Sequence, residues 1–196
     1  MDKTILTPEE SLLIISKTIE ETKKRFKENG HIFIFWGILI LVVALSQYVL
    51  IRMGFANKTG FPCILYPLVG GTYMYIYYRK RHKMNELPKT IIGKVLGTMG
   101  WLLGANFMIL GFMFWQQLGD VLTPIFIVFL AFWIIITGTS IKSKPLFICG
   151  IVINLLAFVT FYFDWQYHPL FMSMAAVIGF IIPGILLNKN KKQANV

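Results

Sequence analysis

The stretch from Ile91 to Trp115 constrains this chain most, because its 25 residues include a single charged side chain, Lys94, close to the start. An α-helix of about 20 apolar residues crosses the hydrocarbon core of a bilayer, which is about 30 Å thick. The composition points the same way: 56% of the 196 residues are hydrophobic and the mean hydropathy is +0.66. Soluble domains are typically about 45–50% apolar. The stretch is therefore predicted to be a membrane-spanning helix.

Small residues mark two predicted packing surfaces. Five glycines recur at helical spacing in the stretch just described and share one side of the helix; they are Gly93, Gly97, Gly100, Gly104 and Gly111. Helices in lipid associate largely by close packing, so a stripe with two G-x-x-x-G spacings predicts a helix–helix contact and places this helix at the centre of the bundle. Ala175, Ala176 and Gly179 offer a second small surface in the last apolar run.

Six apolar runs are long enough to be transmembrane helices. They cover residues 31–51, 61–78, 91–115, 121–141, 145–163 and 168–187. The expected fold class is therefore all-α: a polytopic membrane protein with a six-helix transmembrane bundle over residues 31–188. A cytosolic juxtamembrane amphipathic helix (residues 1–30) precedes the bundle, and a basic cytosolic tail (residues 189–196) follows it.

The distribution of positive charge predicts the orientation. Sixteen of the 19 Lys and Arg residues lie in the N-terminal segment, in the second-to-third and fourth-to-fifth connections and in the C-terminal tail, and a seventeenth, Lys94, lies at the adjoining start of the third run. The other three connections carry only Arg52 and Lys58. Because cytoplasmic loops are enriched in Lys and Arg, both termini are expected in the cytoplasm. The net charge of +10 is explained by topology, so nucleic acid is not an expected partner, whereas membrane lipids are.

The N-terminal segment predicts a helix for association. Thr7, Pro8 and Glu10 have the spacing of a capping box with proline at the first helical position. The predicted helix, residues 8–28, carries an apolar face made by Leu12, Ile15, Ile19 and Phe26. That face can lie on the inner leaflet, pack under the bundle, or pair with a second copy or a partner protein. Five acids balance five bases in this range, which favours packing or pairing over electrostatic membrane binding.

The apolar runs contain no acid or base at mid-depth, which disfavours proton-coupled transport. The polar side chains there are Asn106 in the third run and Asn154 in the fifth, at similar depth. An unpaired amide in hydrocarbon costs several kcal/mol (roughly 2–7), so each needs a partner, and the simplest partner is the other asparagine. An interhelical hydrogen bond is the favoured interpretation, and a polar pocket for a solute is the alternative.

Two outer connections resemble each other in composition. Each has a Trp-Gln pair, one Asp and a proline: Trp115, Gln116, Asp120, Pro124 and Trp165, Gln166, Asp164, Pro169. Three hairpins descended from one unit would explain this, but the spacings differ, so similar loop composition is the favoured account. Asp164 and His168 stand four residues apart and have the spacing of half a metal site, although no third ligand is evident and a surface turn is favoured. No metal, cofactor or catalytic residue is predicted. Cys63 and Cys149 form no C-x-x-C motif.

The N-terminal quarter resembles a known family. Glu10-Ser11-Leu12 with Ile14-Ile15, then Ile19, Phe26 and the Trp36-Gly37 opening of the first run, is similar to a family of small, uncharacterised bacterial inner-membrane proteins with six spans. The resemblance implies a multi-pass protein of the bacterial cytoplasmic membrane. It brings no catalytic residue, cofactor or substrate.

The sequence supports two functional expectations. The first is an accessory or regulatory membrane protein without enzymatic activity, which associates with a second copy or a protein partner through residues 8–28. The alternative is a permease for a small or lipid-like solute, with a polar pocket near Asn106 and Asn154. The strong interaction helix and the absence of ionisable groups in the apolar core favour the first.

Overall fold

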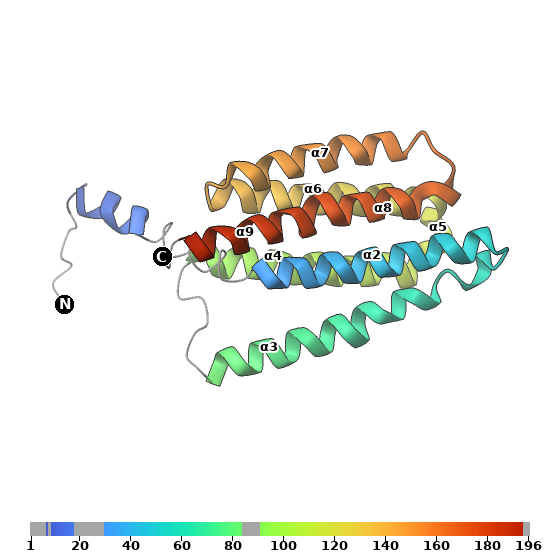
Figure 1. Ribbon diagram of the computed structural model, residues 1–196, viewed down its shortest axis with the longest axis horizontal. Coiled ribbons are helices and arrows are strands. Elements are labelled where there is room, and N and C mark those ends of the chain that lie inside the picture. Colours follow the sequence, from blue (N-terminus) through green and yellow to red (C-terminus); the bar gives the residue numbers. More distant parts are fainter. Residues whose placement is uncertain (1–6, 8, 18–29, 84–90, 194–196) are drawn as a thin grey trace.

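The computed structural model describes residues 7, 9–17, 30–83 and 91–193, and within them the chain is helical with no β-strand. Residues 9–17 form a short N-terminal helix. The remaining elements are α2 (Gly30–Arg52), η1 (Ala56–Lys58), η2 (Phe61–Ile64), η3 (Tyr66–Gly70), α3 (Gly71–Lys83), α4 (Ile91–Met113), α5 (Trp115–Leu118), η4 (Gly119–Val121), α6 (Leu122–Ser140), α7 (Lys144–Thr160), η5 (Trp165–Tyr167), α8 (His168–Ala176), η6 (Val177–Ile181) and α9 (Ile182–Gln193). The long helices run side by side along one axis (Figure 1).

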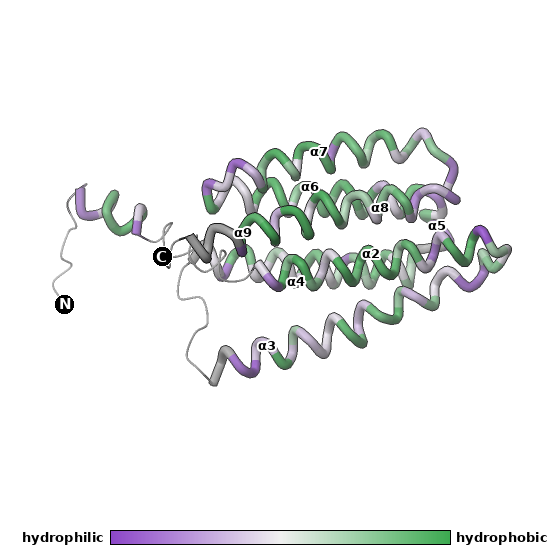
Figure 2. The backbone as a smooth tube through the Cα atoms, in the orientation of Figure 1, coloured by the Kyte–Doolittle hydropathy of each residue, from purple (hydrophilic) through white to green (hydrophobic). Residues whose placement is uncertain are grey.

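Four helical segments are long and apolar enough to cross a membrane: Gly30–Arg52, Gly93–Met113, Gln116–Ser140 and Trp165–Asn188. They match the first, third, fourth and sixth predicted spans. Hydrophobic residues follow these helices, while hydrophilic residues gather toward their ends (Figure 2). Length and composition thus identify a helical membrane protein.

The other two predicted spans are not confirmed as membrane-spanning helices. The fifth corresponds to α7, an apolar helix of 17 residues that is shorter than the others. The second, 61–78, is a succession of short pieces, a 3-10 helix at η2 and a π-helical turn at η3, before α3 begins at Gly71. Pro62 and Pro67 each remove a backbone donor near the start of a piece, which interrupts regular α-helical hydrogen bonding.

The core lies between α2, α6, α7 and the α8–η6–α9 segment. Its most enclosed side chains are β-branched and small, and Ile127, Ile134 and Ile153 have no exposed surface. Val43 of α2 and Ala131 of α6 are equally enclosed. A ring cluster joins these helices: Trp133 stacks on Phe33 and Phe180 with centroids 5.8 and 6.0 Å apart. Burial of these side chains holds the elements in place.

A tight turn brings α7 back along α6. The amide of Ser143 donates to the carbonyl of Gly138 (2.8 Å), and the amide of Lys142 donates to that of Thr139 (3.1 Å). Lys142 has a φ of 52°, so the turn has the hydrogen bonds and left-handed residue of a Schellman motif. The helices then meet closely, because a Cβ added at Gly138 would lie 2.6 Å from the backbone nitrogen of Phe147.

The packing surface of small residues that was predicted in the last apolar run is confirmed. Ala175 and Ala176 are fully buried. A Cβ on Gly179 would come within 2.6 Å of the δ-methyl groups of both Ile134 and Ile153. Gly179 lies in the π-helical turn η6, immediately before the proline-containing start of α9. Small side chains therefore allow this irregular segment to lie between α6 and α7.

The glycine-rich helix α4 is not the centre of the bundle, contrary to the sequence prediction. It packs mainly against α6, through contacts such as the stacked rings of Phe107 and Phe126 with centroids 4.3 Å apart. Only 6% of its most apolar 18-residue stretch is buried inside the protein, compared with 50% of the corresponding stretch in the segment Trp165–Asn188. Outward-facing side chains such as Trp101, which is 70% exposed, cover most of its surface. The glycine stripe showed that one face of this helix lacks side chains, but it did not show how many other helices pack against α4.

Candidate association surface

The N-terminal helix begins with the predicted capping box. The amide of Glu10 donates to Oγ1 of Thr7 (3.3 Å), and the amide of Thr7 donates to Oε2 of Glu10 (2.9 Å). The amide of Ser11 adds a bond to the carbonyl of Thr7 (3.0 Å). These reciprocal bonds satisfy amides that would otherwise lack acceptors at the helix start, and each such cap is worth about 1 kcal/mol. The start of the helix is therefore fixed locally by its own residues.

The same helix presents an uncovered apolar surface. Leu12, Leu13 and Ile15 are 66%, 71% and 55% exposed. Leu12 and Ile15 belong to the predicted association face, whereas Ile19 and Phe26 lie outside the described residues. The amphipathic pattern did not single out Leu13, although the unbroken run Leu12-Leu13-Ile14-Ile15 was a signal for a wider apolar surface. We call Leu12, Leu13 and Ile15 the association face from here on.

The two mid-depth asparagines do not pair. Asn106 lies on the exposed side of α4, and its Nδ2 donates to the carbonyl of Leu102 in the same helix (2.9 Å). Asn154 lies on α7, and its Oδ1 is buried without a hydrogen-bond partner. The expectation that each amide satisfies the other is therefore wrong. The depth of each asparagine follows from its position in an apolar run, whereas the direction that it faces depends on how its helix is rotated against its neighbours.

Hydroxyl groups in the core are satisfied within their own helices. Thr137, Thr160 and Ser173 are buried, and each donates to the carbonyl four residues earlier, at distances of 2.8, 2.8 and 2.9 Å. Such local bonds let a hydroxyl lie in an apolar environment without a partner on another helix. These three side chains therefore add no polar group that points between helices toward a solute.

The glycine stripe of α4 is covered only in part. A Cβ on Gly100 would lie 3.6 Å from the indole nitrogen of Trp133, and one on Gly111 would lie 3.8 Å from the ring of Phe126. Gly97 and Gly104 have no atom within 4 Å of such a position. Gly93 lies in the first turn of the helix. Within one chain, Gly100 and Gly111 therefore contact α6, whereas Gly97 and Gly104 face open space.

Comparison with known proteins gives no relative. No protein-family model, no curated protein and no solved structure matches this chain.

Proposed function

We propose that this protein is a bacterial inner-membrane accessory or regulatory protein without enzymatic activity, which associates with a second copy or a protein partner through its N-terminal helix. The observation that carries the proposal is the exposed association face on a helix with its own capping box. Leucine and isoleucine side chains left in water cost about 1.5–3 kcal/mol each relative to burial, so a partner that covers them gains binding free energy.

The proposal includes six membrane crossings with both termini in the cytoplasm. Helix α7 lies beside α6 and brings the chain to the end of the bundle where α8 begins. Residues 61–83, between α2 and α4, likewise run the length of the bundle and bring the chain to the opposite end, where α4 begins (Figure 1). Arg79, Lys80, Lys142 and Lys144 lie near the ends that this arrangement gives to the cytoplasm. Reporter fusions after Lys83 and after Lys192 should both report a cytoplasmic location. Opposite locations would contradict the topology.

Association is tested by charge substitutions on the association face. The double variant Leu12→Lys/Ile15→Lys should convert a complex to the free chain, as measured by light scattering in mild detergent and by co-purification from native membranes. Glu9→Lys with Lys17→Glu is the matched control, because it changes exposed polar residues of the same helix. The proposal fails if the unaltered protein is monomeric and retains no partner, or if the control disrupts the complex as much as the double variant does.

A permease for a small or lipid-like solute is the second candidate, and the buried, unpaired Oδ1 of Asn154 favours it. A passing hydroxyl or amine could donate to this oxygen. Asn106 does not contribute to such a site, because it bonds to its own helix on an exposed face. Glycerol and urea flux into liposomes that carry the protein separates the two functions. Flux above that of empty liposomes, and altered by Asn154→Leu, would favour transport.

A further inference from the structure

Helix α4 has one side against α6 and another side that the chain leaves open. Phe107 lies on the first side, where its ring stacks on that of Phe126. Asn106 is its neighbour in sequence, so the two side chains point about 100° apart around the helix. Residues at steps of three and four share the open side with Asn106. We call this set the Asn106 seam, and its members are Val95, Met99, Leu102, Asn106, Ile109 and Met113.

The apolar members of the seam face outward. Val95, Leu102, Ile109 and Met113 are between 47% and 69% exposed. Their alternating steps of four and three residues are those of the a and d positions along which two helices of a coiled coil pack. An exposed apolar face is ordinary for a helix in lipid. The exposed side of α2 has the same kind of spacing, at Ile38, Val42, Leu45 and Val49. Spacing alone therefore does not identify a partner for α4.

The carboxamide of Asn106 distinguishes the seam from other exposed faces. Asn106 stands seven residues before Met113, the end of α4, which is about 10 Å along the helix axis. One N–H of its Nδ2 donates to the carbonyl of Leu102 (2.9 Å). The second N–H and Oδ1 have no partner in the part of the chain that the structure describes. Lipid acyl chains offer neither donor nor acceptor, so lipid alone leaves both groups unsatisfied at a cost in free energy.

A second copy of the chain supplies both missing partners. Two copies insert into a membrane with the same orientation, so their α4 helices are parallel and their Asn106 side chains lie at the same depth. A carboxamide is both donor and acceptor, so about a twofold axis each free N–H can donate to Oδ1 of the other copy. One asparagine at an a position also fixes the register of a coiled coil. A different protein would need a polar group at this same depth, which a second copy has necessarily.

We propose that two copies of this protein pair through the Asn106 seam, with the two Asn106 carboxamides hydrogen-bonded to each other between the α4 helices. Interhelical bonds of this kind stabilise helix pairs in lipid. The seam lies on the side of α4 away from Gly104, because two residues correspond to about 200° around the helix. It is also separate from the association face on the N-terminal helix, so the inference goes beyond the proposed function.

Cysteine cross-linking of the full chain in liposomes tests the geometry. The two native cysteines are first replaced by alanine. Leu102→Cys and Ile109→Cys, at the two seam positions flanking Asn106, should each form a disulfide-linked dimer with a mild oxidant. Trp101→Cys and Met108→Cys are the matched controls, because each is one residue earlier, also exposed and about 100° around the helix. The controls should remain mainly monomeric.

Energy transfer between labelled copies in the same liposomes tests the role of the carboxamide. Diluting the protein with lipid gives the dissociation constant of the pair. Asn106→Leu should weaken pairing by roughly tenfold, because it removes two hydrogen bonds between helices. Asn106→Gln keeps a donor and an acceptor and should pair more tightly than Asn106→Leu. Gly104→Leu, on the other side of α4, should pair like the unaltered protein.

Two further measurements separate pairing from folding and from the association face. In a large excess of detergent micelles, where the chains are separated, Asn106→Leu should unfold at the same temperature as the unaltered protein. Leu12→Lys/Ile15→Lys should keep the cross-links at the seam, so the failure of either proposal is visible without the other. The pairing proposal is overturned if Leu102→Cys and Trp101→Cys cross-link equally, if Asn106→Leu pairs as tightly as the unaltered protein, or if Leu102→Cys cross-links to a different protein instead.

Discussion

Two surfaces of small residues in this protein have opposite surroundings. The surface in the last apolar run, Ala175, Ala176 and Gly179, is enclosed between α6 and α7. The stripe on α4 has the more regular G-x-x-x-G spacing, yet Gly97 and Gly104 have open space beside them. Small residues permit close approach of two helices, but they do not supply the apolar side chains that must fill the other half of the contact. Ile134 and Ile153 supply these for Gly179.

The largest effect is expected from Gly179→Leu. The new side chain would have to displace two isoleucines in a fully enclosed region, and overpacking of this kind costs roughly 1–3 kcal/mol of unfolding free energy. Gly104→Leu is the matched substitution on α4, where the space is open, and it should leave the stability of the monomer nearly unchanged. Thermal unfolding in detergent micelles measures both. Equal losses in the two variants would show that the difference between the surfaces is not real.

A smaller effect of opposite sign is expected from Asn154→Leu. This change removes a buried amide oxygen without a partner and keeps a similar volume, so stability should rise by about 1 kcal/mol. Asn106→Leu on α4 is the control, because its amide lies on an exposed face and bonds within the helix; its effect should stay within about 0.5 kcal/mol. A clear loss of stability in Asn154→Leu, in the same unfolding assay, would mean that the Oδ1 atom has a partner in the membrane.

The smallest effect is expected from Gly97→Ala and Gly104→Ala. Neither new methyl group meets an atom, and alanine has less backbone entropy to lose on helix formation, so each change should be neutral or should stabilise by about 0.5 kcal/mol. Measured destabilisation, or a loss of self-association in a cross-linking assay, would show that a second chain covers the stripe. Gly138→Ala, which would meet the backbone of Phe147, gives the contrasting loss within one chain.

Local features were predictable from the sequence because their causes are local. The bonds between Thr7 and Glu10 depend on residues three apart, and the apolar runs that became α2, α4 and α6 depend on composition alone. The interruption of residues 61–70 was missed, since apolar content was counted and the effect of Pro62 and Pro67 on the helix was not.

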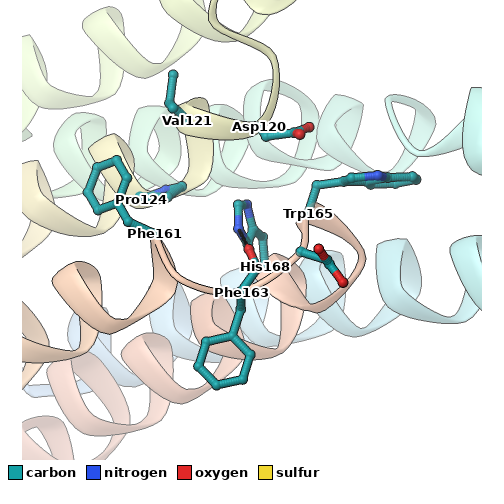
Figure 3. A pocket seen from close by; sticks show the side chains of 8 residues that line it. Asp120, Val121, Pro124, Phe161, Phe163, Trp165 and His168 are labelled. Carbon is teal, nitrogen blue, oxygen red and sulfur yellow. Dashed lines mark hydrogen bonds between the residues drawn. The ribbon is translucent and has the colours of Figure 1, made fainter.

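Arrangement between helices was not predictable in the same way. The rotation of α4 and α7 about their axes separates Asn106 from Asn154, and that rotation depends on which side chains pack on α6. The cavity of about 180 Å³ that Asp120 and Asp164 line (Figure 3) likewise required the relative placement of two connections about 40 residues apart in the sequence. Within the described ranges, no third side chain joins Asp164 and His168 in a metal site. The similar composition of these connections was the only signal, and it says nothing about distance in space.

The length of α7 has a consequence for the lipid around the protein. Its 17 residues make a cylinder about 26 Å long, whereas the 23 residues of α2 reach about 35 Å. Beyond Thr160 the chain continues as an aromatic turn in which Tyr162 is 90% exposed, a side chain that prefers the level of the lipid headgroups. If α7 crosses the membrane, the hydrocarbon layer beside its exposed Ile148 and Leu155 must become thinner by a few ångströms. The protein would then be surrounded by a bilayer of uneven thickness, thinnest next to α7, and lipids with short acyl chains would collect there.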